Sequence, residues 1–433
     1  MIALAITIGL VMIVLLLLGY PMKVPLLVSA LVAVLFFAPF RNASPEVLIQ
    51  QWITGIQPAA LIAVPMFLFA AAIMTRGQAA DRLLDVVMSF VGHHRGGLPI
   101  TTAVSCALFG AISGSTQATV VAIGGPLRPR LLRAGYPDSF AIALIINASD
   151  IALLIPPSIG MIVYGVVSGT SIGELFIAGI GPGVMILFFF CVYCRVAAVR
   201  MGVPALPRAE SSQRRRSIAR AVLPAGFPVI VIGGIYSGLF SPTEAAAMSV
   251  LYAVVLEFAI FRGMRLAQLP EIARSTALIT AIVFVLVGAG QAFSWVVSYA
   301  ELPALLVEGL FRLDESSGQL QVLLSIAVAT FIGCMFVDPI VVILILTPIF
   351  APVAASAGVD PVLVGTVVTM QVAIGSATPP FGCDIFTAMA TFRRPYVEII
   401  RGTPPFLLIL LGSSLLVILF PQIALTLRDL AFS

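Results

Sequence analysis

Apolar runs of bilayer length recur from one end of the 433-residue chain to the other. About 20 consecutive apolar residues are enough to cross the hydrocarbon layer as a helix. Inside that layer every backbone N–H and C=O must find its partner within the protein, so spanning segments are helices or closed barrels. The chain is 60% hydrophobic and only 10% charged, whereas soluble domains carry about 25% charged residues. We therefore predict an all-α polytopic membrane protein.

Short loops separate the apolar runs and leave no room for a soluble domain. The net charge of +4 comes largely from arginines in these loops, which is typical of an orientation signal rather than of a nucleic-acid surface. The first run lacks a basic start and a cleavage site, so we interpret it as a retained helix. The predicted spans are 2–20, 24–40, 59–75, 138–167, 175–197, 222–240, 242–260, 276–298, 361–390 and 403–420.

A pattern of glycines and prolines occurs twice, 223 positions apart, from Gly110 and Gly333 onwards. No insertion or deletion interrupts the match, which indicates a duplicated unit. Secondary transporters use such duplication to build two interconvertible faces around one site. The matched residues are Gly110, Pro129, Gly135, Pro156, Pro157, Gly179 and Pro182 in the first copy, and Gly333, Pro352, Gly358, Pro379, Pro380, Gly402 and Pro405 in the second.

Two apolar segments, 98–126 and 320–349, do not read as simple spans because small, polar or proline residues lie at their middles. Each is long enough for two half-depth helices joined by a break. Irregular backbone at that depth is tolerated only where it is buried in protein or lines a wet cavity. We predict two re-entrant hairpins.

Arginine-rich loops mark the cytoplasmic side of a membrane protein. Segments 195–220, 76–97 and 127–138 carry such arginines, so the first hairpin is predicted to enter and leave from the cytoplasm. Segment 300–319 is mainly acidic and segment 350–361 has no basic residue, which places the second hairpin outside. Opposite biases at matched loops predict an inverted-topology repeat, with both termini outside.

Segments 77–92 and 301–313 occupy equivalent places in the two copies, and we interpret them as interfacial amphipathic helices that support the hairpins. The predicted organisation is N-terminal scaffold helices over 1–58; a first repeat over 59–197, with hairpin 98–126 and broken helix 138–167; a basic cytoplasmic loop and scaffold helix pair over 198–275; a second repeat over 276–420, with hairpin 320–349 and broken helix 361–390; and a C-terminal tail over 421–433.

The proline pairs Pro156-Pro157 and Pro379-Pro380 are predicted to break the helix of a long apolar span in each copy, because proline removes amide donors and clashes with the preceding turn. Freed carbonyls and nearby hydroxyls are hard oxygen ligands suited to Na⁺, and a half-helix N-terminus attracts an anion. Because Ser113-Gly114-Ser115 has no copy in 336–338, we expect two cation sites that are not identical.

The candidate residues surround these breaks and the hairpin tips. Candidate cation ligands are Ser113, Gly114, Ser115, Asn147, Ser149, Pro156 and Ser158 in the first copy, and Gly333, Asp338, Thr378, Pro379 and Gly382 in the second. Candidate substrate-binding residues between the breaks are Ser115, Thr116, Asp150, Pro157, Pro380 and Asp384.

Simpler interpretations stand beside these. A proline pair alone is often only a kink, and Ser113 and Ser115 could serve close packing of the hairpin arms. Asp150 is either a cation or proton ligand or a residue that faces water or caps the broken helix. Asp384 and Glu257 are placed nearer the membrane edge, where acidic residues are more often structural.

The motifs resemble those of the large membrane subunit of tripartite ATP-independent periplasmic (TRAP) transporters, over nearly the whole chain. The first copy supplies GAISGSTQATVVAIG at 110–124, RAGYPDSFAIALIINAS at 133–149 and IPPSIGMIVYG at 155–165. The second supplies FIGCMFVDP at 331–339, GVDPVLVG at 358–365 and IGSATPPFG at 374–382. Together these motifs are highly specific.

The resemblance implies a Na⁺-coupled importer of the bacterial inner membrane that works by an elevator mechanism. It also implies two partners on separate chains, a periplasmic substrate-binding protein and a small four-helix membrane subunit. Family substrates are mostly organic anions that bear a carboxylate. The chain departs from the family pattern at Asp150, Gln371 and Asp384. The two aspartates add negative charge near the expected cavity and argue against a plain monocarboxylate or dicarboxylate substrate.

Three other classes of function compete with this one. A channel would need a continuous polar lining, whereas polar residues here gather at two breaks. An intramembrane enzyme would need a nucleophile–base pair, a metal cluster or paired carboxylates, and the sequence has no HExxH motif. The CxxC formed by Cys191 and Cys194 lies within an apolar run, so we interpret these cysteines as packing residues and not as a metal or redox site. A carrier of the same architecture outside the TRAP family is the nearest competitor.

Overall fold

The apolar runs fold as helices throughout the computed structural model, which describes residues 2–37, 40, 44–205, 207–208, 210–302 and 318–432. Within these ranges there is no β-strand, so the predicted all-α class is confirmed. The α-helices are α1 (Ile2–Leu17), α2 (Lys23–Phe36), α3 (Glu46–Ile56), α4 (Ala63–Arg76), α5 (Ala79–Val91), α6 (Gly97–Ser113), α7 (Thr116–Arg133), α8 (Asp138–Ser149), α9 (Ile159–Ser168), α10 (Ile172–Arg200), α11 (Ser211–Tyr236), α12 (Pro242–Val254), α13 (Leu269–Tyr299), α15 (Gln319–Phe336), α16 (Pro339–Ser356), α17 (Pro361–Ser376), α18 (Cys383–Phe392), α19 (Tyr396–Ile400), α20 (Pro404–Leu419) and α21 (Gln422–Phe432).

Seven helices of the described chain are long and apolar enough to cross a membrane, or up to eight when α20 and α21, bent by 56° at Pro421, count as one span. By this criterion α15 and α16 could each cross fully, so re-entrance of the hairpins stays a prediction. The seven segments are Ala59–Arg76, Ile172–Arg200, Ser211–Tyr236, Pro242–Ile260, Leu266–Tyr299, Gln319–Phe336 and Pro339–Ser356.

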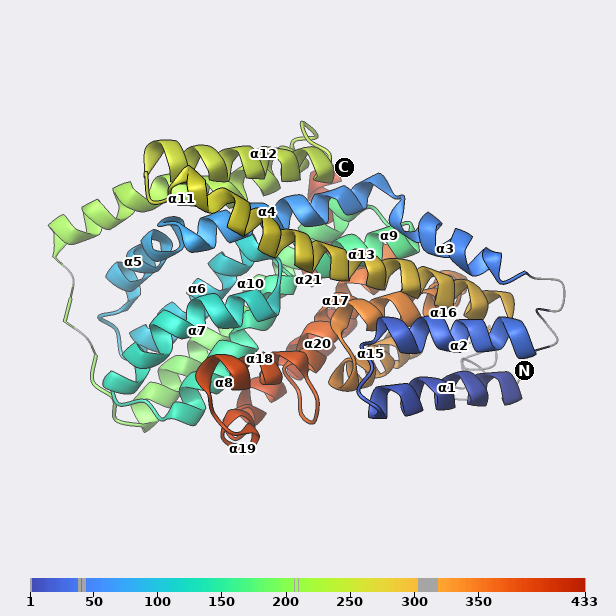
Figure 1. Cartoon of the computed structure of the whole chain (residues 1–433). Coiled ribbons are helices and arrows are strands. Elements are labelled where there is room, and N and C mark those ends of the chain that lie inside the picture. The colour runs from blue at the N-terminus through green and yellow to red at the C-terminus, as the bar shows by residue number, and fades with distance from the viewer. Residues whose placement is uncertain are drawn as a thin grey trace.

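Helices from the N-terminal part and the middle of the chain pack together along one side of the molecule. The long helix α13 lies against α2, α3 and α4, while α12 lies against α4 and α11 (Figure 1). The hairpin helices α6 and α16 touch this layer through α4 and α13 respectively. The layer therefore borders both hairpins.

Helix boundaries repeat at the spacing found in the sequence. Helices α6 and α15 end at Ser113 and Phe336, which are 223 positions apart, and their partners α7 and α16 begin at Thr116 and Pro339, at the same spacing. The proline pairs Pro156-Pro157 and Pro379-Pro380 both contain cis peptide bonds. The duplicated pattern therefore corresponds to duplicated helices, and the opposite membrane orientation of the two copies stays a prediction.

Several helices are longer than predicted. The hairpins extend over 97–133 and 319–356, because the residues beyond the apolar runs continue the same helices. Much of the basic segment 198–220 is helical, since α11 begins at Ser211 and its first turns are rich in arginine, a good helix former. The predicted support helix 77–92 is α5, whereas most of its counterpart, 301–313, lies outside the described residues.

The segment predicted as a C-terminal tail forms helix α21, which packs against α10. Arg428 of α21 pairs with Asp360 at 2.9 Å and with Glu174 at 3.5 Å. These two acidic residues lie at the start of α17 and of α10, so one guanidinium ties α21 to the ends of both helices.

Glu257 joins the scaffold to the helix that precedes the first hairpin. It lies in the π-helical turn Val255–Ile260, is fully buried, and accepts the backbone N–H groups of Gln78 and Ala79 at 2.8–3.1 Å. An ideal Cβ at Gly77 would lie 2.1 Å from the Glu257 Cδ, so only glycine permits this approach. The carboxylate therefore caps α5, which agrees with the structural interpretation.

We expect Glu257→Gln to lower the free energy of unfolding by about 2 kcal/mol, because the buried amide groups lose a charged acceptor. Thermal unfolding of the purified protein in detergent measures the change. Glu271→Gln is the matched control, since Glu271 forms an exposed pair with Arg76 and its loss should cost less than about 0.5 kcal/mol. Equal melting temperatures for the two variants would contradict the capping role.

Candidate functional site

The tip of the first hairpin rests on the first helix break. Gly114, between α6 and α7, has φ +61° and an ideal Cβ there would lie 2.4 Å from the carbonyl oxygen of Pro157. The Ile159 N–H donates to the Gly114 carbonyl at 3.4 Å. Ser113, Gly114, Pro156, Pro157 and Ser158 are all buried here. The structure thus brings the predicted first-copy residues of tip and break together.

The second hairpin meets the second break in a similar way. The Phe381 N–H donates to the Met335 carbonyl at 3.1 Å, and the Cys334 thiol donates to the Val372 carbonyl at 2.9 Å. Pro379 and Pro380 are partly exposed and Phe381 is 54% exposed, so this break reaches the surface of the described structure. Gly333 instead lies inside α15, nearest to the Val342 side chain of α16. Its observed contact is with the opposite hairpin arm.

Ser115 and Asp338 occupy matching positions and perform the same structural task. Ser115 accepts the Ala118 N–H at 3.4 Å at the start of α7, and Asp338 accepts the Ile340 N–H at 2.9 Å at the start of α16. An N-cap side chain satisfies a backbone donor that the helix leaves free. The unusual charge of Asp338 is therefore explained locally by capping, and its second oxygen stays a candidate ligand.

Asp384 links the two copies of the repeat. It lies in the first turn of α18, is fully buried, and accepts the Thr116 hydroxyl at 2.8 Å and the Ser376 hydroxyl at 2.6 Å. Helix α7 of the first copy packs against α18 of the second and covers Asp384, while the depth of this residue in the membrane stays a prediction. An apolar cluster that includes Val120, Ile145 and Ile385 seals the same contact.

Hydroxyl and amide oxygens near the breaks remain available to a cation. The Asn147 Nδ2 donates to the Ala143 carbonyl at 2.8 Å, while its Oδ1 is buried without a partner. Ser149 and Thr378 donate to the carbonyls four residues earlier, which leaves their lone pairs free to accept. These hard oxygens fit Na⁺, as predicted from the sequence. Among the described residues there is no cluster of three His, Cys, Asp or Glu for a transition metal.

Asp150 ends α8 at the first break and is buried, at 1% exposure. Neither of its carboxylate oxygens has a hydrogen-bond partner. The structure thus shows no capping role for Asp150, and its role as a cation or proton ligand stays a prediction.

The sequence reasoning missed two polar residues of α17. The Ser376 hydroxyl donates to Asp384. Its position two residues before Thr378, a predicted ligand, could have marked it in the sequence. Thr369 is buried with an unpartnered hydroxyl and lies near Gly160 of α9. Gln371 was noted as a departure from the family pattern, and its amide donates to Ser414 while its carbonyl oxygen lacks a partner.

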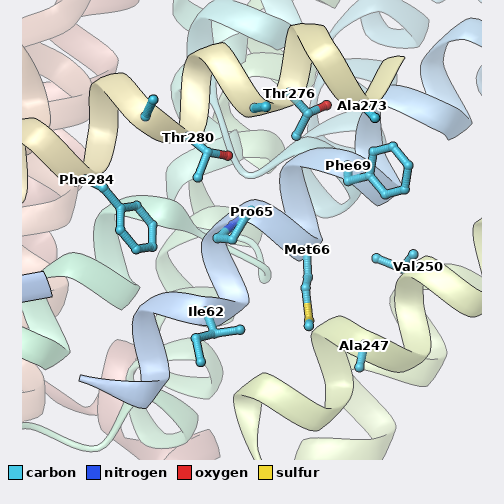
Figure 2. Close-up of a pocket in the computed structure, with 12 residues that line it drawn as sticks. Ile62, Pro65, Met66, Phe69, Ala247, Val250, Ala273, Thr276, Thr280 and Phe284 are labelled. Carbon is cyan, nitrogen blue, oxygen red and sulfur yellow. The ribbon is translucent and has the colours of Figure 1, made fainter. Parts of the chain in front are cut away.

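A cavity of about 740 Å³ lies elsewhere, between α4, α12 and α13 (Figure 2). Its wall is apolar apart from Thr276 and Thr280, with Met66, Phe69 and Phe284 among the larger side chains. This lining offers no charged group, so it does not suit an ionic solute. The candidate solute site therefore remains at the two breaks.

Known proteins resemble this chain over nearly its whole length. The sequence profile of the tripartite ATP-independent periplasmic transporter, DctM component, matches residues 10–423. The ectoine/5-hydroxyectoine TRAP transporter large permease of Ruegeria pomeroyi is 65% identical over 99% of this chain and 100% of its own length. The ectoine TRAP large permease of Halomonas elongata is 61% identical, covering 97% and 98%.

More distant relatives include the C4-dicarboxylate TRAP large permease of Pseudomonas aeruginosa, at 36% identity over 85% of this chain and 86% of its own. Among solved structures, the YdaH transporter of Alcanivorax borkumensis aligns with a TM-score of 0.63 at 19% identity, covering 91% of each chain. That likeness concerns the fold alone. On the strength of the sequence matches, the chain belongs to the DctM family of TRAP transporter large permeases, whose partners are a periplasmic binding protein and a small membrane subunit.

Proposed function

We propose that this chain is the large permease of a Na⁺-coupled TRAP transporter that imports ectoine or a closely similar solute across the bacterial inner membrane. The contrast in identity carries the proposal: 65% and 61% to permeases named for ectoine, against 36% to one named for C4-dicarboxylates. Ectoine is a small cyclic zwitterion, with a carboxylate and a delocalised amidinium cation on one ring. It bears the carboxylate that the family resemblance implies, but it is a zwitterion and not the organic anion that was expected.

The carboxylate of such a solute would bind at the half-helix N-termini that follow the breaks. Helices α9 and α18 begin at Ile159 and Cys383, directly after the proline pairs. The N-terminus of a helix presents free N–H groups and a partial positive charge, which suit an anion. The buried residues of the described chain include no arginine or lysine, so these N-termini and bound Na⁺ are the positive groups available.

Sodium would bind at the oxygens on either side of the solute. In the first copy these are the hydroxyls of Ser113 and Ser149 and carbonyls at Pro156–Ser158; in the second they are the hydroxyl of Thr378, the free oxygen of Asp338 and carbonyls near Pro379 and Gly382. At about 100 mV each inward Na⁺ releases about 2.3 kcal/mol from the membrane potential. Two ions would thus drive accumulation of one solute.

An elevator movement would carry hairpins and broken helices as one body against the scaffold. Two contacts support a single body: the Thr116–Asp384 hydrogen bond and the apolar cluster that α7 and α8 share with α18. Both contacts cross from one copy of the repeat to the other. A periplasmic binding protein would deliver the solute, and a separate small four-helix subunit would complete the membrane complex.

Uptake of labelled ectoine into proteoliposomes that contain the permease, the small subunit and the binding protein tests the proposal. We expect an inward Na⁺ gradient to raise initial uptake at least tenfold, since the gradient supplies the driving force. Equimolar K⁺ is the matched control. Equal uptake under both conditions would contradict Na⁺ coupling, and absent uptake would contradict ectoine as substrate.

We expect Gly114→Ala to reduce uptake at least tenfold, because Ala is strained at positive φ and its Cβ would collide with the Pro157 carbonyl. The change would hold the first hairpin away from the break, and ectoine uptake in the same vesicles measures it. Gly125→Ala on α7 is the matched control, as an ideal Cβ there meets nothing within 4 Å. Full uptake by Gly114→Ala would show that close seating of the tip is dispensable.

A further inference from the structure

Asp150 is the one carboxylate in the described structure whose two oxygens are both buried without a partner. It closes α8 at the first break, where the chain continues as the 3₁₀ turn Asp150–Leu153. Burying a charge without a partner is far more costly than burying a paired one. A carboxylate in this position is either protonated or paired with a cation, and none of the ion pairs among the described residues supplies that cation.

Asp150 lies where the first hairpin meets the second copy of the repeat. The 3₁₀ turn that it begins packs against α6 and α7 of the first hairpin and against α17 of the second copy. A group bound at Asp150 would therefore lie between the two copies, where the solute is expected.

A second acceptor accompanies Asp150. Asn147 precedes it by three residues, and residues three apart share one face of a helix. The Asn147 Oδ1 is fully buried and also lacks a partner. Two neighbouring side chains thus present only acceptor atoms, which is the complement of a group that has several N–H donors and a positive charge.

The described residues offer Asp150 no counter-charge. None of the ion pairs in the described chain includes Asp150 or Asp384, and the basic members of these pairs are Arg76, Arg128, Arg394 and Arg428. Asp384 differs from Asp150 because two hydroxyls already donate to it. Asp384 therefore already has hydrogen-bond partners, and Asp150 is the carboxylate with bonds still to make.

We propose that Asp150, assisted by Asn147, binds the positively charged group of a zwitterionic solute. The inference rests on the proposed function and deepens it, because it explains how the site would distinguish a zwitterion from a dicarboxylate. In the ring of ectoine the two amidinium N–H groups point away from each other, so one can donate to Asp150 and the other to a separate acceptor such as Asn147 Oδ1. A dicarboxylate would instead place a second negative charge beside Asp150.

The test compares Asp150→Asn with the wild type in the purified complex of this chain and its small subunit. We expect the variant to melt at the same or a higher temperature without solute, since it removes an unpaired buried charge. The rise in Tm caused by saturating Na⁺ should persist, whereas the rise caused by ectoine should disappear. In proteoliposomes the KM for ectoine presented by the binding protein should rise at least about tenfold, the factor expected for a lost charged hydrogen bond.

Asp138→Asn is the matched control, at the opposite end of the same helix. Asp138 pairs with Arg128 at 2.6 Å and with Arg394 at 3.1 Å. This variant should therefore lose thermal stability yet keep the ectoine-induced shift. A purely structural role for Asp150 would produce the Asp138 pattern at both positions and would overturn the proposal.

Loss of the Na⁺-induced shift in Asp150→Asn, with the ectoine shift retained, would assign Asp150 to the coupling ion and also overturn the proposal. Should the Asn variant fail to assemble, Asp150→Glu keeps the charge but moves it. We then expect a weakened ectoine shift and an unchanged Na⁺ shift, and equal ectoine shifts in Asp150→Glu and wild type would be contrary evidence.

A failure of this inference can be distinguished from a failure of the proposed function. If vesicles with the wild type and vesicles with Asp150→Asn take up ectoine equally well, only the present inference is refuted. If wild-type vesicles take up no ectoine, the same melting experiment with glycine betaine, proline and succinate decides. A zwitterion-induced shift that Asp150→Asn abolishes would support the inference without ectoine, whereas stabilisation by succinate alone, or by none of the three, would refute it.

Discussion

The need to satisfy backbone groups at two broken helices is the constraint on which the rest of this structure depends. A break at a proline pair leaves carbonyls before it and N–H groups after it without helical partners, in an apolar span where no water replaces them. Each hairpin contributes a carbonyl that accepts an N–H group after a break, Gly114 from Ile159 and Met335 from Phe381. The hairpins therefore supply acceptors to the broken helices, and the broken helices in turn position the hairpin tips.

Duplication gives the two halves the same helices but not the same chemistry. Ser115 and Asp338 cap equivalent helices, yet one is neutral and the other acidic. Asp150 and Asp384 occupy positions that have no acidic copy, since their matches at this spacing are Ala373 and Met161. An asymmetric ligand with one positive and one negative end requires such a difference, because identical half-sites would present the same charge to both ends.

Much of the fold could be predicted from residue patterns, because proline, glycine and charge act locally. The hairpin tips at Gly114 and Asp338 and both proline breaks were evident from these residues. The burial of Asp384 could not be predicted, because it depends on α7 packing across the repeat boundary and not on distance along the chain. Helix α21 was missed for a similar reason, since Arg428 makes its ion pairs with Glu174 and Asp360, far away in sequence.

The bond between Thr116 and Asp384 connects the first hairpin of one copy to the broken helix of the other. A movement that separated the copies would expose a buried carboxylate that had lost a donor, which costs about 1–3 kcal/mol or more. It would also open the apolar cluster around Val120 and Ile385 to water. Both penalties vanish when hairpins and broken helices move together. The same contact that shields Asp384 thus favours rigid-body motion of the whole binding region over the opening of one half.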